Sequence, residues 1–390
     1  MKVLIAGGGI GGITAALCLA RDGHEITVFE QAESFGEVGA GIQLSPNCTR
    51  VLHWLGLEDA LRASGFLPVA TQIRSWDTGH VISESPLGDA AVARFGAPYY
   101  HIHRGDLLAL LVAAAERATN ICLRTGARLT WFEPTSGKVR IATAGATDEG
   151  DLLIGADGIH SGVRAALWGN ETPTFTGHVA WRAMVRVADL PEGLVRPMST
   201  VWWGPGRHFV HYYVRRRELV NCVCVVEKTG WEVESWTERG DYEAFRADFA
   251  GWHGDVQRLI DRVDRTSLYQ WALFDRPPMA AWGKGRVTLL GDACHPTLPF
   301  MAQGAAMAIE DGAVLAACLR RDEEVSVALG RYENLRRART AKVQRGSRRN
   351  GAVFHMSGIG AWFRDRVAGK AAARALDPIY GFDVLHEVLD

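Results

Sequence analysis

Residues 2–30 read KVLIAGGGIGGITAALCLARDGHEITVFE. The apolar run 2–6 predicts a strand, the glycines that follow it predict a tight turn, and residues 13–20 predict a helix. A second apolar run at 26–29 ends in the acid Glu30. The stretch therefore has the GxGxxG pattern of a dinucleotide-binding βαβ unit, with an acid closing its second strand.

Each glycine of this loop has a physical use. Gly7 allows the tight turn, Gly9 lets the backbone approach a pyrophosphate, and Gly12 lets helix and strand pack closely. Gly11 is assigned to the same cofactor loop, and Glu30 is placed to accept hydrogen bonds from a ribose. The glycine pattern alone fits NAD, FAD or a mere turn, but the strand, helix and acid around it indicate a dinucleotide.

Two later stretches narrow the type of dinucleotide. Residues 151–164, DLLIGADGIHSGVR, predict a buried strand followed by an Asp-Gly turn, which alone could be a turn that precedes a helix. Residues 291–312, GDACHPTLPFMAQGAAMAIEDG, predict a turn, a proline-stiffened loop and a helix that begins near Gly304. The positive end of that helix suits a planar anionic ring such as a reduced flavin.

The three stretches, in this order, resemble the single-component FAD-dependent aromatic hydroxylases, particularly the salicylate-hydroxylase-like members. The resemblance extends from Met1 to about residue 350. It implies an α/β fold with an FAD-binding doubly wound domain, Rossmann-like in its ββα variant. An inserted, mostly antiparallel β-sheet forms the substrate domain, and a helical region forms the C-terminus. It also implies FAD as cofactor, with NADH or NADPH and molecular oxygen as co-substrates.

The resemblance assigns FAD contacts beyond the first loop. They are Gln31, Gly41, Arg104, Leu129, Asp157, Asp292, Pro299, Gly304 and Ala305. Asp292 is expected at the ribityl chain, and the loop after it against the isoalloxazine. Arg104, within HRGDL, could instead be a solvated arginine at a helix start. Gln31 and Leu129, the latter expected in the third strand of the nucleotide fold, are weaker candidates on the adenine side.

The predicted domains are discontinuous. Segments 1–68, 98–176 and 271–355 are assigned to the FAD-binding domain, segments 69–97 and 177–270 to the substrate domain, and 356–390 to a C-terminal tail. Strands are expected at 178–187, 199–203, 208–214 and 219–226. This sheet is expected to form the roof of a substrate pocket.

Alternation along the strand at 208–214 leaves two choices for the catalytic face. His208 and Tyr212 share one face, and His211 and Tyr213 share the other. The resemblance favours His208 and Tyr212, because related hydroxylases carry a His and a Tyr four positions apart in the matching strand. A neutral histidine can take the phenolic proton, which speeds attack by a flavin C4a-hydroperoxide. A purely structural histidine is the alternative.

The substrate pocket is expected to include Gln43, Trp203, Phe300 and Met301. In 6-hydroxynicotinate hydroxylases, which the chain also resembles, the positions of Gln43 and Phe300 are histidines, so that substrate is disfavoured. The preferred hypothesis is a salicylate-like phenolic acid that is converted to a catechol with loss of carbon dioxide. The alternatives are a 3-hydroxybenzoate- or 6-hydroxynicotinate-type hydroxylase, and a non-catalytic flavin-binding protein.

A carboxylate-bearing substrate needs a cationic anchor. Arg74 and Arg182 are candidates for it, although each could equally be a surface or structural residue.

The composition of the chain is consistent with an enzyme that acts on a small molecule. The chain has 390 residues, is 47% apolar and carries a net charge of −1, which favours neither nucleic acid nor membrane partners. The seven cysteines include no CxxC pair, so we expect no metal site and a cytoplasmic location. No apolar run is long enough to span a membrane. We expect a monomer or homodimer with a small aromatic acid as its substrate.

Overall fold

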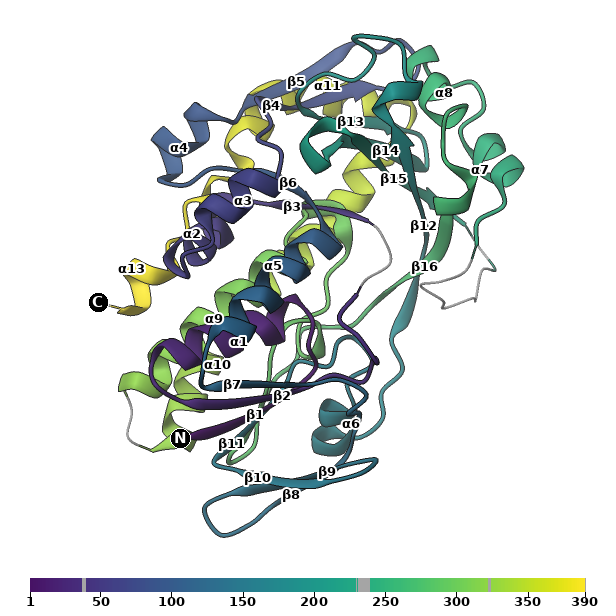
Figure 1. Ribbon diagram of the computed structural model, residues 1–390. Helices are drawn as coiled ribbons and strands as arrows, with labels where there is room; N and C mark the ends of the chain where they lie inside the picture. Colours follow the sequence, from purple (N-terminus) through teal and green to yellow (C-terminus); the bar gives the residue numbers. More distant parts are fainter. Residues whose placement is uncertain (37–39, 229, 231–238, 322–323, 390) are drawn as a thin grey trace.

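The structure is a computed structural model that describes residues 1–36, 40–228, 230, 239–321 and 324–389 (Figure 1). Two main sheets organise it. A five-stranded sheet and its helices occupy the lower part of the view in Figure 1, and a seven-stranded sheet occupies the upper right.

The five-stranded sheet is entirely parallel, with the order β17-β11-β1-β2-β7. Its strands are β1 (Lys2–Ala6), β2 (Glu25–Phe29), β7 (Ile121–Arg124), β11 (Leu152–Gly155) and β17 (Val287–Leu289). Its central strands are apolar and buried almost throughout, as expected for a sheet covered on both faces. One face is covered by helices, and the other by a three-stranded antiparallel sheet (Figure 1). The helices are α1 (Ile10–Arg21), α5 (Arg104–Arg117) and α9 (Gly304–Arg321), and the strands are β8 (Leu129–Pro134), β9 (Val139–Thr143) and β10 (Thr147–Gly150).

The three diagnostic sequence stretches come together because they follow neighbouring strands. β1 pairs with β11, and β11 pairs with β17, so the carboxyl ends of these strands lie side by side. Those ends lead into Gly7, Ala156 and Gly291. Ligands of parallel α/β sheets bind outside the carboxyl ends of the strands, so this edge is the expected cofactor position.

The seven-stranded sheet has the order β16-β12-β15-β14-β13-β4-β5 and is antiparallel except between β13 and β4. Its strands are β4 (Ala70–Ser75), β5 (Val81–Pro86), β12 (Thr174–Arg186), β13 (Ser199–Gly204), β14 (Arg207–Val214), β15 (Leu219–Glu227) and β16 (Tyr269–Asp275). One face packs an apolar core against α7 (Tyr242–Asp248) and α8 (Gly254–Ile260). The other face turns toward the five-stranded sheet and its helices (Figure 1).

A short antiparallel ribbon and several helices complete the fold. The ribbon is β3 (Gly41–Leu44) with β6 (Tyr100–His103). The remaining helices are α2 (Pro46–Trp54), α3 (Glu58–Ser64), α4 (Asp89–Phe95), α6 (Gly162–Trp168), α10 (Val325–Phe354), α11 (Gly358–Ala375), α12 (Asp377–Tyr380) and α13 (Val384–Leu389). No helix among the described residues is long and apolar enough to cross a membrane.

The predicted strands and the helix at Gly304 are confirmed, but two details of the sequence analysis are wrong. The boundaries at 176/177 and 270/271 fall inside strands, because β12 and β16 pair with each other from Thr174↔Asp275 onward. Residues 174–176 and 271–275 therefore belong to the seven-stranded sheet. Leu129 does not lie in the nucleotide sheet, whose edge is β7; it begins β8 of the three-stranded sheet.

Candidate active site

A cavity of about 990 Å³ lies between the carboxyl edge of the five-stranded sheet and the seven-stranded sheet. The predicted site residues that line it are Gly9, Gly11, Gly41, Gln43, Arg104, Trp203, His208, Tyr212, Asp292, Pro299, Phe300, Met301, Gly304 and Ala305. The predicted residues that do not line it are Gly7, Gly12, Glu30, Gln31, Leu129 and Asp157. Most residues from the three diagnostic stretches and from the substrate sheet thus share one space.

The glycines of the loop after β1 have two different surroundings, because Gly7 and Gly12 lie against the backbone and Gly9 borders open space. A Cβ on Gly7 would lie 2.3 Å from the Ala156 carbonyl oxygen, and one on Gly12 would lie 2.0 Å from the Gly7 carbonyl oxygen. A Cβ on Gly9 would meet nothing within 4 Å, although Gly9 lines the cavity. Gly9 is also the N-cap residue of α1, a helix with no side-chain cap and no acid in its first turn. The positive end of α1 therefore opens onto space that an FAD pyrophosphate fits.

Glu30 stands directly behind this loop. Its Oε2 accepts a hydrogen bond from the Gly8 N–H at 2.7 Å, and its Oε1 accepts one from the Ala32 N–H at 2.9 Å. The carboxylate is thus fixed at the end of β2, beside the loop that the ribose of a bound dinucleotide would approach. Gln31 is exposed next to it.

The Gly291–Asp292 turn is braced from inside the protein. Asp311 of α9 accepts hydrogen bonds from the Gly291 N–H at 3.1 Å and from His295 Nε2 at 2.6 Å. Burial raises the pKa of Asp311, but His295 and Arg336 outweigh that effect and lower it to about 2. The ionised Asp311 therefore holds the turn, while the Asp292 side chain is exposed and lines the cavity.

Asp157 lies beside the cavity on the turn after β11. Its Oδ2 accepts a hydrogen bond from the Val163 N–H at 3.1 Å. Its Oδ1 is buried and has no hydrogen-bond partner among the described residues. A buried carboxylate oxygen without a donor is costly, so an additional donor near this turn would stabilise the site.

Gly41 joins the cofactor side of the cavity to the substrate sheet. Its N–H donates to Asn221 Oδ1 at 2.7 Å, and a Cβ here would lie 2.9 Å from the Tyr212 ring. The Tyr212 ring in turn lies over His101 of β6, with centroids 4.5 Å apart. Burial raises the pKa of the Tyr212 hydroxyl. Tyr212 therefore keeps its proton and can donate a hydrogen bond into the cavity.

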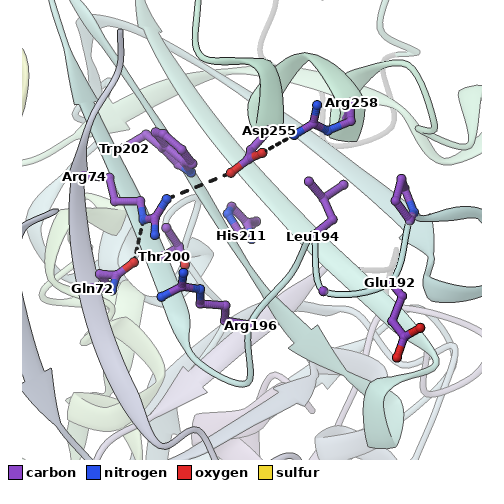
Figure 2. Close-up of a pocket in the computed structure, with 12 residues that line it drawn as sticks. Gln72, Arg74, Glu192, Leu194, Arg196, Thr200, Trp202, His211, Asp255 and Arg258 are labelled. Carbon is purple, nitrogen blue, oxygen red and sulfur yellow. Dashed lines mark hydrogen bonds and ion pairs between the residues drawn. The ribbon is translucent and has the colours of Figure 1, made fainter. Parts of the chain in front are cut away.

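The two faces of β14 look into different spaces. His208, Val210 and Tyr212 line the large cavity, whereas His211 lines a separate cavity of about 410 Å³ on the other side of the sheet. Figure 2 shows His211 in that second cavity with Arg74, Trp202 and Asp255. The sequence left open which face of β14 looks toward the cofactor. In the structure, the face with His208 and Tyr212 lines the cavity at the carboxyl edge of the five-stranded sheet.

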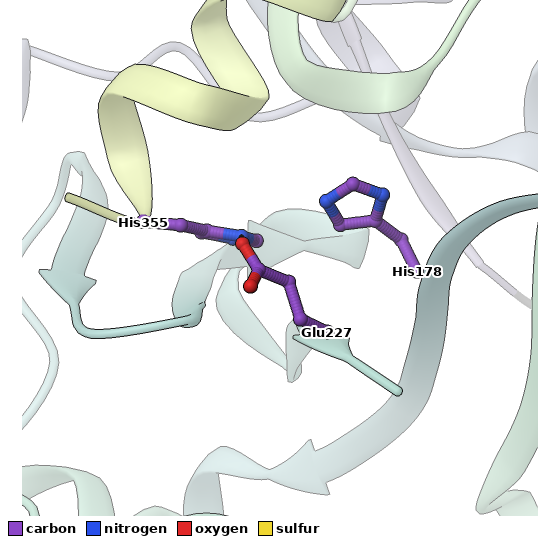
Figure 3. Close-up of side chains that lie close together, drawn as sticks. All are labelled: His178, Glu227 and His355. Atoms are coloured by element: carbon purple, nitrogen blue, oxygen red, sulfur yellow. The ribbon is translucent and has the colours of Figure 1, made fainter. Parts of the chain in front are cut away.

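His208 is buried and tied to a second histidine. Its Nδ1 lies 2.9 Å from His355 Nε2, and His355 Nδ1 lies 2.9 Å from Glu227 Oε1. Burial first, and then the neighbouring His355 and His178, hold the pKa of His208 well below 6.5. His208 is therefore neutral near pH 7. Figure 3 shows His355, Glu227 and His178 grouped together.

The predicted pocket residues form walls of the same cavity. Gln43 accepts a hydrogen bond from the Tyr99 hydroxyl at 3.0 Å and donates to Ser199 Oγ at 2.9 Å, so its amide is held in one orientation. The Phe300 ring lies 5.4 Å from the His208 ring. The Trp203 ring stacks on Phe354, with centroids 5.0 Å apart.

Of the two candidate carboxylate anchors, only Arg182 reaches this cavity. Arg182 lines the cavity, packs over the Trp271 ring at 5.0 Å, and pairs with no described carboxylate. Arg74 lies in the second cavity, where it bonds to Gln72 and approaches Asp255.

The sequence analysis did not find His355 or Glu227. They lie 147 and 128 positions from the residues to which they bond, and nothing in their local sequence signals the contact.

Comparison with known proteins agrees with this geometry. A family model described as FAD binding domain matches residues 1–347. The chain is 40% identical to 3-amino-4-hydroxybenzoate 2-monooxygenase PtnB3 of Streptomyces platensis, over 98% of this chain and 96% of that protein. It is 41% identical to 6-hydroxynicotinate 3-monooxygenase of Pseudomonas fluorescens, over 90% of this chain and 91% of that protein. It is 38% identical to 3-hydroxybenzoate 6-hydroxylase of Polaromonas naphthalenivorans, over 98% and 96%.

Solved structures show the same fold. Klebsiella pneumoniae HpxO, complexed with FAD and uric acid, has a TM-score of 0.86 at 27% identity and covers 97% of this chain and 96% of its own. A salicylate hydroxylase substrate complex has a TM-score of 0.83 at 23% identity, covers 100% of this chain and 97% of its own, and supports the fold alone.

The chain therefore belongs to the FAD-binding-domain family of aromatic-ring monooxygenases. The predicted cofactor, FAD, and the predicted co-substrates, NADH or NADPH and oxygen, are confirmed, and the alternative of a non-catalytic flavin protein is set aside.

Proposed function

We propose that this enzyme hydroxylates a single-ring aromatic acid that carries a ring hydroxyl group. The observation that carries the proposal is that one cavity joins the FAD-binding edge to His208, Tyr212 and Arg182 of the seven-stranded sheet. A neutral base and a cation in the same space suit a substrate with one ionisable hydroxyl and one carboxylate.

The residues on one side of the cavity are proposed to bind the parts of FAD. The N-terminus of α1 at Gly9 takes the pyrophosphate, Glu30 the ribose and Asp292 the ribityl chain. The start of α9 at Gly304 presents backbone N–H groups to the flavin ring. When bound and reduced by NAD(P)H, FAD supplies the activated oxygen atom that is transferred to the aromatic ring.

His208 is proposed as the base. Because it is neutral near pH 7, it can accept the proton of a ring hydroxyl and make the ring more electron-rich. Tyr212, which keeps its proton, donates a hydrogen bond to the same region of the substrate. Phe300 and Trp203 exclude water from the ring by walling the cavity.

Arg182 is proposed to bind the carboxylate. Its guanidinium lies in the cavity without an acidic partner among the described residues. A charge-assisted hydrogen bond to a carboxylate is strong in a site that holds little water, so this position suits the acid group of the substrate.

The preferred substrate remains salicylate-like, with hydroxylation at the carboxyl-bearing carbon, release of carbon dioxide and formation of a catechol. The named substrates of the relatives, 3-hydroxybenzoate, 6-hydroxynicotinate and 3-amino-4-hydroxybenzoate, have the same two polar groups and are the alternatives. The resemblance to 6-hydroxynicotinate hydroxylases implies histidines at the positions of Gln43 and Phe300. This chain has no histidine at either position, which weighs against the pyridine substrate.

The test is turnover of the FAD-loaded enzyme with NADH and a panel of these acids, with products and carbon dioxide measured. Catechol with one carbon dioxide per oxygen consumed supports the salicylate assignment, whereas a dihydroxybenzoate that keeps its carboxylate supports a 3-hydroxybenzoate type. Arg182→Met should raise KM for the acid about ten- to a hundredfold, the value of one charge-assisted hydrogen bond, and should spare the corresponding carboxamide. Arg186→Met, on the same strand but 71% exposed, is the matched control. An equal effect on acid and carboxamide would remove Arg182 from this role.

A further inference from the structure

A line of hydrogen bonds leads from the cavity to the surface of the protein. It runs from His208 of β14, through His355 at the end of α10, to Glu227 at the end of β15. Figure 3 shows the outer two of these residues, His355 and Glu227, with His178 near them. Both links measure 2.9 Å. His208 and His355 are 3% and 6% exposed, whereas the Glu227 side chain is 53% exposed. The line therefore connects a buried ring at the cavity wall with a carboxylate in contact with solvent.

The chemistry of the groups fixes which nitrogen atoms carry protons. The ionised Glu227 only accepts hydrogen bonds, so His355 Nδ1 must carry a proton. Neutral His355 then has an acceptor at Nε2, so His208 Nδ1 must donate to it. Neutral His208 is left with an unprotonated Nε2, the atom that a base needs. The external carboxylate thus sets the tautomer of the ring at the cavity wall.

We propose that His208, His355 and Glu227 form a proton relay that carries the substrate's hydroxyl proton out of the closed cavity. The substrate O–H bond breaks and its proton joins His208 Nε2, while the Nδ1 proton of His208 passes to His355 Nε2. The Nδ1 proton of His355 passes in turn to Glu227, which releases it to water. One proton enters the relay and one leaves it, so neither histidine keeps a charge, and the negative charge of the ionised hydroxyl group stays on the substrate. The proposal rests on the proposed function, because it requires a substrate hydroxyl group at His208.

The surroundings of His355 are suited to transfer rather than to storage of charge. His178 of β12 faces it with ring centroids 5.4 Å apart, Arg207 contributes a further positive charge, and the Phe300 ring is an apolar neighbour with centroids 6.1 Å apart. Burial, opposed by Glu227 and assisted by His178 and Arg207, lowers the pKa of His355 to about 4. A protonated His355 is therefore short-lived near pH 7, and the proton continues to Glu227.

The same neighbourhood has the composition of a metal site. Ligand atoms of His178, Glu227 and His355 all lie within 4.8 Å of one another. Both ring nitrogens of His355 are already in hydrogen bonds, however, and a metal ion would have to break the link to Glu227 or to His208. The relay uses all the observed contacts as they stand.

The first experiment compares Glu227→Gln, His355→Phe and the control Glu218→Gln in the FAD-loaded enzyme. Glu218 is an exposed acid at the opposite end of β15. Both relay variants should keep their flavin and hydroxylate about tenfold or more slowly. This loss is smaller than the full effect of general-base catalysis, because His208 itself is still present. In Glu227→Gln the rate should rise with the concentration of an external buffer such as phosphate, because buffer replaces the surface carboxylate. The wild type and Glu218→Gln should show no such buffer dependence.

A second readout does not use turnover. A nitro-substituted hydroxybenzoate changes its absorbance when its hydroxyl group ionises, so stopped-flow mixing follows proton loss as it binds. Ionisation should be slow and buffer-dependent in Glu227→Gln and fast in the wild type. Equal ionisation rates, together with unchanged hydroxylation, would overturn the relay while the proposed function stands. A wild type that hydroxylates none of the acids would overturn both. Loss of activity with a chelator and its return with zinc would replace the relay by a metal site.

Discussion

The carboxylate of Glu30 serves the glycine loop before any cofactor arrives. It accepts hydrogen bonds from the backbone at Gly8 and Ala32, so the loop is already shaped for a dinucleotide. The sequence pattern assigned this acid to the ribose, and the structure adds its contact with the loop. Both uses depend on the position of Glu30 at the end of β2, which a single sequence can predict.

Replacement of Glu30 should therefore weaken FAD binding without unfolding the protein. In Glu30→Ala, the loss of charge-assisted hydrogen bonds should cost about 1.5–3 kcal/mol of FAD affinity, which flavin fluorescence titration measures. Glu116→Ala, an exposed acid on α5, is the matched control. An unchanged FAD dissociation constant in Glu30→Ala would show that the ribose is bound elsewhere.

Residues whose role depends on contacts with distant parts of the chain could not be predicted from the sequence. His208 and Tyr212 were predicted, since alternation along one strand places them on one face. His355 and Glu227 were not, because their role depends on α10 ending against the substrate sheet. Asp311, which braces Gly291, is likewise an ordinary helical residue in its local sequence.

At the scale of elements, the turn between β1 and α1 divides its glycines into two kinds. Gly12 is needed for packing, since its Cβ would lie 2.0 Å from a carbonyl oxygen, whereas Gly9 borders open space. Gly9→Val should therefore fold with near-normal stability and bind no FAD, while Gly12→Ala should lower the stability of the apoprotein. Thermal unfolding with and without FAD separates the two effects. Gly145→Ala, in open space far from the site, is the control. A flavin-replete Gly9→Val protein would contradict the pyrophosphate assignment.

Helices α9 and α10 are held together by buried charges. Arg336 of α10 contacts Glu310 and Asp311 of α9, each at 2.7 Å, and all three side chains are fully buried. Arg336→Met should leave Asp311 without one partner and destabilise the protein by about 3–5 kcal/mol, as measured by urea unfolding. Arg337→Met, whose side chain is 43% exposed, should change stability by less than about 1 kcal/mol. If the two variants were equally stable, the triad would contribute no more than a surface pair.

Strand and helix positions were largely predictable, whereas domain edges were not. The alternation in β12 to β15 and the proline loop before α9 are local signals, and each matched its element. The partner of a strand is not a local signal, so residues 271–275 were assigned to the FAD-binding domain although they pair with β12 of the seven-stranded sheet. The division into two domains stays a prediction, with its edges moved to 174 and 275.

For the whole molecule, buried neutral histidines set the response to acid. His101 is fully buried, and burial lowers its pKa from 6.5 to about 3. As the pH falls below 6.5, the unfolded chain binds a proton here and the folded chain does not, so stability falls until the pH approaches 3. Each such histidine contributes a slope of up to about 1.4 kcal/mol per pH unit.

His101→Phe should make the free energy of unfolding less dependent on pH, because it removes the contribution of one buried histidine. Between pH 7 and pH 5 the variant should lose about 2 kcal/mol less free energy of unfolding than the wild type. Chemical denaturation at the two pH values, at a fixed FAD concentration, gives the comparison. His80→Phe, at an exposed position, is the control and should retain the wild-type slope. Parallel losses in all three proteins would show that His101 is protonated in the folded state.

The order of strands in the two sheets also governs the order in which the chain can be completed during synthesis. The seven-stranded sheet joins β4 and β5 to strands from 174–227 and closes with β16, while the five-stranded sheet waits for β17. A growing chain that has passed residue 155 thus holds four of the five parallel strands but lacks the edge that carries Asp292. Pairings so distant in sequence form slowly and leave strand edges open in the meantime. The edge of the sheet that receives FAD is therefore complete only after β17 and the start of α9 have been synthesised, and we expect FAD to bind only after that point of translation.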